Sequence, residues 1–316
     1  MFKKIILGLL ALAVVVGAAI GFYVWREGQG IDPAVLEAKY MTPADRFVDV
    51  AGAHVRVRID GPEDAPAIIL LHGFIHSLET WDGWAKALSG NYRVIRYDLL
   101  GHGLTGPDPQ KRYAPEERAE FTGDLMDALG IDSAIIAGNS LGGLAAWRFA
   151  AAHPDRVRAL ILVSPGAYSV NGVSDTPIEP PKAMELFLRT APEASVRLAS
   201  ERVFGDDSKI TEERLVVFRD MMRRRGNGEA FIESIKEFTL PDPAPDLAKI
   251  TAPTLILWGA EDVVISVEQA RRLEQDISGA RLVVYDGVGH IAQEEAPEAS
   301  SADVASFLAA LSRDAS

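Results

Sequence analysis

The sequence has no cysteine in its 316 residues, which excludes disulfides, thiolate metal ligands, cysteine nucleophiles and lipidated cysteines. Basic residues are also few, since 32 Lys and Arg stand against 45 Asp and Glu, a formal charge of −13. Nucleic acid is therefore not an expected partner, because binding a phosphate backbone requires a basic surface. The remaining composition, 48% hydrophobic and 24% charged, is that of a globular protein.

A single long apolar run occurs, and it lies at the N-terminus. The first four residues carry two lysines, residues 5–25 carry no charge, and Arg26 follows. At 1.5 Å per residue this run spans about 30 Å, the thickness of a bilayer core. Tyr23 and Trp25 stand where interfacial aromatic residues are expected. The pattern predicts a transmembrane helix, with residues 1–26 forming a cytoplasmic stub and an anchor.

The positive charges before the run predict a single-pass, membrane-anchored protein whose main domain lies on the translocated side. In a bacterium this would be the periplasmic face of the inner membrane. Two alternatives are a buried helix and a cleaved signal peptide, for which residues 16–18 offer a small-residue site. Cleavage would give a secreted protein. The anchor is favoured because the apolar run continues past Ala18.

Strand-like and helical segments alternate from residue 46 onward. Strands are predicted at residues 46–50, 53–60, 67–72, 92–98, 133–138, 159–163, 254–259 and 281–285. Helices are predicted at residues 78–88, 115–129, 141–152, 267–277 and 297–311. This α/β alternation predicts a mostly parallel, doubly wound sheet of eight strands, because right-handed crossovers place helices on both of its faces.

The alternation is interrupted between residues 168 and 246. Three prolines there lead into helical segments at residues 183–189, 194–203 and 212–225. We predict an inserted helical cap over the carboxyl ends of the strands. The predicted organisation is a linker at 27–45, a core formed by 46–167 and 247–316, and a cap at 168–246.

A turn centred on Ser140 joins the predicted strand at 133–138 to the helix at 141–152. A serine between Gly138 and Gly142 at such a turn adopts a strained backbone that lifts its hydroxyl above the sheet. The N–H of Leu141 then lies at the start of a helix, where it can donate to a developing oxyanion. Gly73, at the end of an earlier strand, lets the N–H of Phe74 point to the same space.

A serine nucleophile needs a base, and the base needs a carboxylate on its other ring nitrogen. Asp262 follows the strand at 254–259, and His290 follows the strand at 281–285. Glu261 is the nearest rival for the carboxylate. Among the six histidines, His290 alone follows a late strand and comes after the acid in the chain. The order Ser140, Asp262, His290 is typical of one arrangement of the Ser-His-Asp triad.

These motifs resemble the α/β-hydrolase-fold serine hydrolases over residues 46–311. The resemblance is carried, in chain order, by His72–Phe74, Asp98–Gly103, Gly138–Gly143, Trp258–Asp262 and Gly289–His290. It implies an α/β-hydrolase fold with a catalytic triad of Ser140, Asp262 and His290. It also implies that the backbone N–H groups of Phe74 and Leu141 form the oxyanion hole, and that no cofactor or metal is needed.

Two branches of that family resemble the sequence most. With its predicted anchor, the chain is similar to membrane-anchored monoacylglycerol-lipase-like esterases. The turn around Ser140 is also similar to that of meta-cleavage-product hydrolases, which cleave C–C bonds. The chain departs from the second branch where Phe74, Ile75 and His76 replace a glycine-rich loop, and where Ile291 follows the proposed base.

The main function expected is therefore hydrolysis of a carboxylic ester, acylglycerol or lipid-like, through an acyl-enzyme on Ser140. Ile75, His76, Met184 and Phe187 are the expected substrate-binding residues. A C–C hydrolase or an acyltransferase with the same triad is an alternative, and a membrane-tethered binding or sensing protein is the non-enzyme alternative. A membrane partner through the N-terminal helix is also expected, and the sequence does not specify an oligomeric state.

Overall fold

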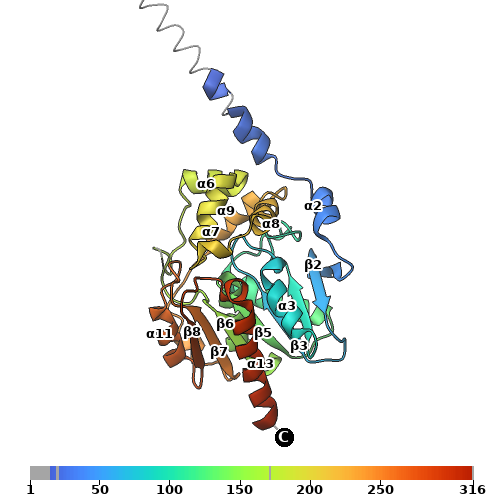
Figure 1. The fold of residues 1–316 in the computed structure, drawn as a ribbon, viewed down its shortest axis with the longest axis vertical. Helices are drawn as coiled ribbons and strands as arrows, with labels where there is room; N and C mark the ends of the chain where they lie inside the picture. Colours follow the sequence, from blue (N-terminus) through green and yellow to red (C-terminus); the bar gives the residue numbers. More distant parts are fainter. Residues whose placement is uncertain (1–14, 19–20, 171, 315–316) are drawn as a thin grey trace, which may run out of the picture.

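The computed structural model describes residues 15–18, 21–170 and 172–314, and its centre is an eight-stranded sheet (Figure 1). The strand order is β1-β2-β4-β3-β5-β6-β7-β8. Strand β2 runs against its neighbours β1 and β4, and all other neighbouring strands are parallel. The strands are β1 (Asp45–Val50), β2 (Ala53–Asp60), β3 (Ala67–Leu71), β4 (Arg93–Tyr97), β5 (Ala134–Asn139), β6 (Val157–Val163), β7 (Thr254–Gly259) and β8 (Arg281–Tyr285). The predicted mostly parallel sheet is confirmed.

Successive residues of the central strands point to opposite faces, and each face has its own apolar core. In β3, Ile69 and Leu71 join one core, whereas Ile68 and Leu70 join the other. The first core is covered by α4 (Pro115–Ala128), α5 (Leu141–Ala152), α10 (Ala244–Leu247) and α11 (Glu268–Asp276). The second is covered by α3 (Asp82–Leu88), α12 (Ala292–Glu295) and α13 (Pro297–Asp314). Burial on both faces explains why these strands are nearly continuous apolar runs.

The helices between β6 and β7 lie together at one end of the molecule, where Figure 1 shows them above the sheet. Those that lie there are α6 (Lys182–Thr190), α7 (Glu193–Glu201), α8 (Glu212–Met222) and α9 (Asn227–Glu237), whereas α10 packs on the first core of the sheet. They share a small apolar core that includes Leu188, Val196 and Phe231. The three predicted cap helices end at residue 225 and leave out α9, because Gly226 and Gly228 interrupt the helical pattern where this helix begins.

Short helical turns complete the fold: η1 (Leu78–Trp81), η2 (Pro154–Arg156) and η3 (Asp207–Lys209).

Near η1, the antiparallel edge of the sheet contains a buried ionic cluster centred on Arg56. Its guanidinium contacts Asp45 at 2.7 Å, Glu79 at 2.7 Å and Asp98 at 3.3 Å. Burial alone would lower the pKa of Arg56, but Asp98, Glu79 and Asp45 raise it.

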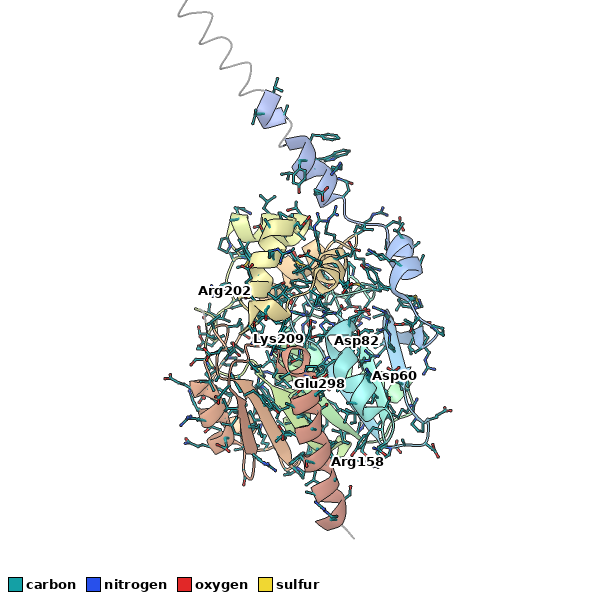
Figure 2. All side chains as sticks on the ribbon, in the orientation of Figure 1. Asp60, Asp82, Arg158, Arg202, Lys209 and Glu298 are labelled. Carbon is teal, nitrogen blue, oxygen red and sulfur yellow. The ribbon has the colours of Figure 1, made fainter. Side chains whose placement is uncertain are left out.

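A second arginine of this edge, Arg96, bridges two carboxylates that are labelled in Figure 2, Asp60 and Asp82. Asp60 ends β2 and Asp82 begins α3, so the bridge joins the sheet to a covering helix. The Arg96 side chain is almost fully buried, whereas that of Asp82 is more than half exposed. Together with the Arg56 cluster, this bridge fixes the loop between β3 and α3 at the sheet edge.

The transmembrane prediction requires correction. Within the part of the chain that the structure describes, every helix is too short or too polar to pass through a bilayer. Residues 21–28 form a short helix that ends with two charged side chains, and Glu27 pairs with Arg219 and Arg223 of the cap region. Residues 5–14, 19 and 20 of the predicted span lie outside the described residues. The predicted membrane-anchored localisation is contradicted, and attachment to a membrane through this helix is unsupported.

Residues 27–45, predicted as a linker, contain a helix, α2 (Pro33–Tyr40). The Asp32 side chain caps it by accepting a hydrogen bond from the N–H of Ala34. This segment joins the cap to the sheet edge. On the cap side, Ile31 forms a backbone β-bridge with Arg224, next to α8, and the Tyr40 hydroxyl donates to Asp220 of α8. On the sheet side, the Tyr40 carbonyl accepts a hydrogen bond from Arg56 of β2.

Candidate active site

Ser140 occupies the tight turn between β5 and α5. Its backbone has φ 52° and ψ −114°, a conformation that costs a non-glycine residue energy and is retained only when its surroundings enforce it. Close packing enforces it here. A Cβ on Gly138 would lie 2.3 Å from the carbonyl oxygen of Gly142, and one on Gly142 would lie 2.3 Å from that of Leu71. Both positions therefore require glycine.

Phe74 and Leu141, whose backbone N–H groups are the predicted oxyanion donors, both lie near Ser140. Leu141 is the first residue of α5, so its N–H has no partner inside the helix. Gly73 packs against the turn, since a Cβ there would lie 3.3 Å from the Ser140 Cβ. Phe74 follows Gly73, and both Phe74 and Leu141 line the same cavity as Ser140. This arrangement could stabilise an anion formed when Ser140 adds to a carbonyl group.

The loops after β7 and β8 bring Asp262 and His290 together. The His290 Nδ1 lies 2.8 Å from the Asp262 Oδ2, and both side chains are buried. The other carboxylate oxygen accepts hydrogen bonds from the N–H groups of Val264 and Ile265, each at 2.9 Å. If Nδ1 donates to the carboxylate, Nε2 is left as a proton acceptor. The rival carboxylate, Glu261, is exposed.

Asn139 links the Ser140 turn to the His290 loop. Its amide Nδ2 donates to the carbonyl of Val163 at 3.0 Å and to that of His290 at 3.1 Å. Among the described residues, the Ser140 hydroxyl and the His290 ring do not form a hydrogen bond. Such bonds are often long in enzymes without substrate and tighten when it binds.

Glu295 is a buried carboxylate that the sequence analysis did not single out. It accepts hydrogen bonds from the N–H groups of Gly205 at 3.0 Å, Asp206 at 2.8 Å and Gly289 at 2.7 Å. The N–H of His290 donates to the carbonyl of Val203 at 2.7 Å. The His290 loop is therefore hydrogen-bonded to the cap segment that follows α7. Glu294 stands beside Glu295 in the sequence, and nothing there indicates which of the two is buried.

Three further histidines surround the loop at the end of β3. His72 and His102 are fully buried, and burial lowers the pKa of His72 to about 4 and that of His102 well below its usual value. Their rings lie edge-on to each other at 5.3 Å, and the ring of Phe74 packs on His102. His76 stacks on Phe218 of α8, and burial and Arg214 lower its pKa. Neutral rings at these positions support the loop.

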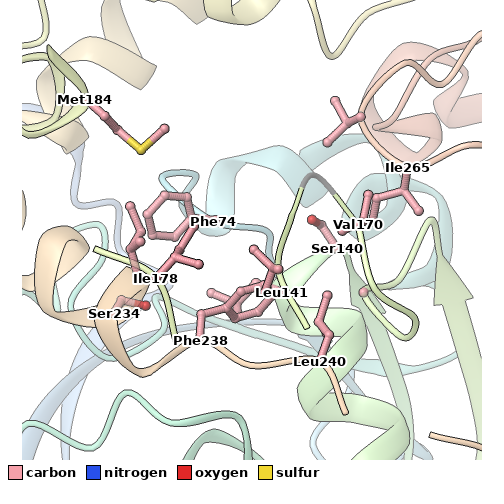
Figure 3. Close-up of a pocket in the computed structure, with 14 residues that line it drawn as sticks. Phe74, Ser140, Leu141, Val170, Ile178, Met184, Ser234, Phe238, Leu240 and Ile265 are labelled. Carbon is pink, nitrogen blue, oxygen red and sulfur yellow. The ribbon is translucent and has the colours of Figure 1, made fainter. Parts of the chain in front are cut away.

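A cavity of about 320 Å³ opens above Ser140, between the sheet and the cap (Figure 3). Its described lining is almost entirely apolar: Val170, Val173, Ile178, Met184, Ile235, Phe238, Leu240, Val264 and Ile265 join Phe74 and Leu141. Of the four predicted substrate-binding residues, only Met184 lines this cavity. Ile75 and Phe187 pack into the cap core, and His76 lies against Phe218.

The fold agrees with comparisons to known proteins. The alpha/beta hydrolase fold family matches residues 66–297. The chain belongs to this family. It is a hydrolase of that family, as its relatives are.

Three similar proteins are named for different substrates. A 2-hydroxy-6-oxononadienedioate/2-hydroxy-6-oxononatrienedioate hydrolase of Paraburkholderia xenovorans (strain LB400) is 31% identical, covering 79% of this chain and 89% of its own. The enol-lactonase of Burkholderia xenovorans LB400 has a TM-score of 0.69 at 30% identity, covering 84% of this hydrolase and all of that chain (100%). A membrane phospholipase A has a TM-score of 0.75 at 25% identity, covering 98% and 99%.

Proposed function

We propose that this protein is a serine hydrolase that cleaves a bond to a carbonyl carbon. Ser140 attacks the carbonyl while His290 takes its proton, and Asp262 holds the His290 ring and stabilises its positive charge. The N–H groups of Phe74 and Leu141 receive the oxyanion. As the bond to the carbonyl carbon breaks, His290 gives this proton to the leaving group. Water then attacks the acyl group on Ser140 with the neutral His290 as base, and His290 returns the proton to the Ser140 oxygen as the acid is released. The observation that carries this proposal is the buried 2.8 Å contact of His290 with Asp262 beside the strained Ser140 turn.

The first candidate for the cleaved bond is a C–C bond next to a ketone, as in meta-cleavage products. Two relatives named as 2-hydroxy-6-oxononadienedioate/2-hydroxy-6-oxononatrienedioate hydrolases support it, at 31% and 29% identity over 89% and 94% of their length. This corrects the order expected from the sequence, in which ester cleavage came first. When a C–C bond breaks, the carbon leaving group needs its negative charge delocalised onto a remote oxygen. A site for such an oxygen would therefore support this candidate.

Ester hydrolysis is the second candidate, and the cavity favours it. Its lining offers no charged side chain among the described residues, which suits an apolar acyl group better than a free dicarboxylate. The enol-lactonase and the phospholipase A, both named for ester substrates, support it as well. The two candidates share the same attack by Ser140 and differ in the leaving group.

A comparison of three substrate classes tests the proposal. Purified protein is assayed with 2-hydroxy-6-oxohexa-2,4-dienoates, an enol-lactone and p-nitrophenyl alkanoates, each in parallel with the Ser140→Ala variant. A kcat/KM for the dienoates at least about 100-fold above that for the alkanoates would establish C–C cleavage, and the reverse order would establish ester cleavage. Turnover that persists in Ser140→Ala, or turnover of none of the three classes, would contradict the proposal.

A further inference from the structure

Arg118 of α4 is a buried guanidinium close to the cavity. Its side chain is 3% exposed, and it donates to the carbonyls of Tyr113 and Leu100, each at 3.0 Å. Among the described residues, no carboxylate lies within ion-pairing distance of it. Burial lowers the pKa of Arg118 to about 10, so it stays charged at neutral pH. A buried cation without an ion pair is costly and needs every available acceptor.

The third acceptor of Arg118 is the hydroxyl oxygen of Ser234, at 2.9 Å. Ser234 lies on α9 of the cap, so this bond joins the cap to α4. Because the oxygen accepts from a cation, the O–H is polarised and becomes a stronger donor. Within the described part of the chain, the Ser234 hydroxyl has no acceptor for its own proton.

Ser234 also lines the cavity. Among the described lining residues, Ser140 and Ser234 are the only two with polar side chains. Figure 3 shows them on opposite sides of the cavity, with apolar side chains between them. The cavity thus has one reactive hydroxyl at one side and one donor, backed by Arg118, at the other.

We propose that Ser234 is a specificity-determining residue that donates a hydrogen bond to a second carbonyl oxygen of the substrate, remote from the carbonyl attacked by Ser140. The substrate class is therefore a keto-acyl chain that is otherwise apolar. One hydroxyl offers one hydrogen bond, which suits a ketone oxygen better than a carboxylate with two charged oxygens. The inference rests on the proposed function, because it takes Ser140 as the point of cleavage.

A series of activated esters tests the inference without knowledge of the natural substrate. The reference is p-nitrophenyl octanoate, and the probes are p-nitrophenyl octanoates with one ketone at carbon 4, 5, 6 or 7. A ketone buried without a donor is penalised, so most positions should react more slowly than octanoate. At the position that reaches Ser234, kcat/KM should exceed that of octanoate by about tenfold.

Substitutions assign this preference to the hydroxyl. Ser234→Ala should abolish the preference, measured within each variant as the ratio of kcat/KM for the favoured ketone to kcat/KM for octanoate, and Ser234→Thr, which keeps a hydroxyl, should restore this ratio. Ser200→Ala is the matched control, because Ser200 is also a buried cap serine but donates to the carbonyl of Val196 in its own helix. A purely structural role of Ser234 would lower the turnover of octanoate and ketone probes equally.

The outcomes separate the inference from the proposed function. If no probe is hydrolysed in a Ser140-dependent way, the proposed function is wrong. If octanoate is hydrolysed and no ketone position exceeds it, the inference is wrong and the proposed function stands. The same holds if Ser234→Ala keeps the ketone preference. Should Ser234→Ala fail to fold, the ketone preference of the wild type and of Ser234→Thr still tests the inference, because both proteins keep the hydroxyl at position 234.

Discussion

The carboxylate of Glu295 accepts a hydrogen bond from the N–H of Gly289 at 2.7 Å, one residue before the proposed base His290. The same carboxylate accepts hydrogen bonds from the N–H groups of Gly205 and Asp206, which follow α7 of the cap, so one side chain joins the cap to the loop that carries the base. Hydrogen bonds to an ionised, buried acceptor are among the stronger ones in proteins. The position of His290 consequently depends on a residue that does not contact the cavity.

Replacing Glu295 by Ala should destabilise the protein and lower kcat. The N–H groups of Gly205, Asp206 and the buried Gly289 would lose their charged acceptor, which costs about 3 kcal/mol of unfolding free energy. A misplaced base lowers kcat more than it raises KM, so urea unfolding and steady-state kinetics are measured together. Glu298→Ala, at the exposed position labelled in Figure 2, is the matched control and should change neither quantity. Unchanged kcat in Glu295→Ala would refute a positioning role.

Replacing Asp262 by Asn should lower kcat by about 10³- to 10⁴-fold, because an amide that donates to His290 would favour the wrong tautomer. The variant should still fold, since Asn and Asp have nearly the same shape. The exposed neighbour Glu261 supplies the control, and Glu261→Gln should keep wild-type kcat. If Glu261→Gln is the inactive variant and Asp262→Asn is active, the assignment of the acid is wrong.

Stability should fall between pH 7 and pH 5.5 because of the buried histidines. His72 binds a proton with a pKa near 6.5 when unfolded and about 4 when folded, and the pKa of buried His102 is also lowered. In this range the unfolded state therefore holds more protons, which favours unfolding as pH falls. Each ring should cost about 1 kcal/mol across the range.

Urea unfolding at the two pH values measures this loss. His72→Gln should lose less stability than the wild type over the same interval, by about 1 kcal/mol, whatever its stability at pH 7. His54→Gln removes an exposed histidine and serves as the control for loss of an imidazole. A wild-type stability that is flat from pH 7 to pH 5.5 would contradict the buried, neutral state of His72.

Replacing Arg56 by Met should destabilise the fold by about 3–5 kcal/mol, because Asp98 would remain buried without a cation and Asp45 would keep only Arg58. Arg46→Met, at an exposed position of the same edge, should change the unfolding free energy by less than about 0.5 kcal/mol. Thermal or urea unfolding distinguishes the two. Equal effects would mean that the Arg56 cluster contributes no more than an exposed charge.

Much of the sheet could be predicted from the sequence, because a strand buried on both faces must be a short, nearly continuous apolar run. The Ser140 turn could be predicted because Gly138 and Gly142 have no substitute there. Helix α9 was missed because its glycines conceal the helical period. The N-terminal prediction was wrong for the described residues, where the helix at residues 21–28 is short and carries the charged Arg26 and Glu27.

The polar residues that organise the site were harder to predict. Arg118, Ser234 and Glu295 are ordinary helix residues in the sequence, and only the packing of distant elements buries them. Phe187 is an apolar residue of the predicted cap, and Ile75 is an apolar residue of the loop after the strand at 67–72. Apolarity does not distinguish a side chain that lines a cavity from one that fills the cap core.

Covalent labelling tests the nucleophile most directly. A fluorophosphonate reacts with a serine that its neighbours activate, and peptide mass spectrometry then locates the adduct. The wild-type protein should carry one adduct, on Ser140, and Ser140→Ala should carry none. A folded wild-type protein that stays unlabelled, or an adduct on a serine other than Ser140, would contradict the account.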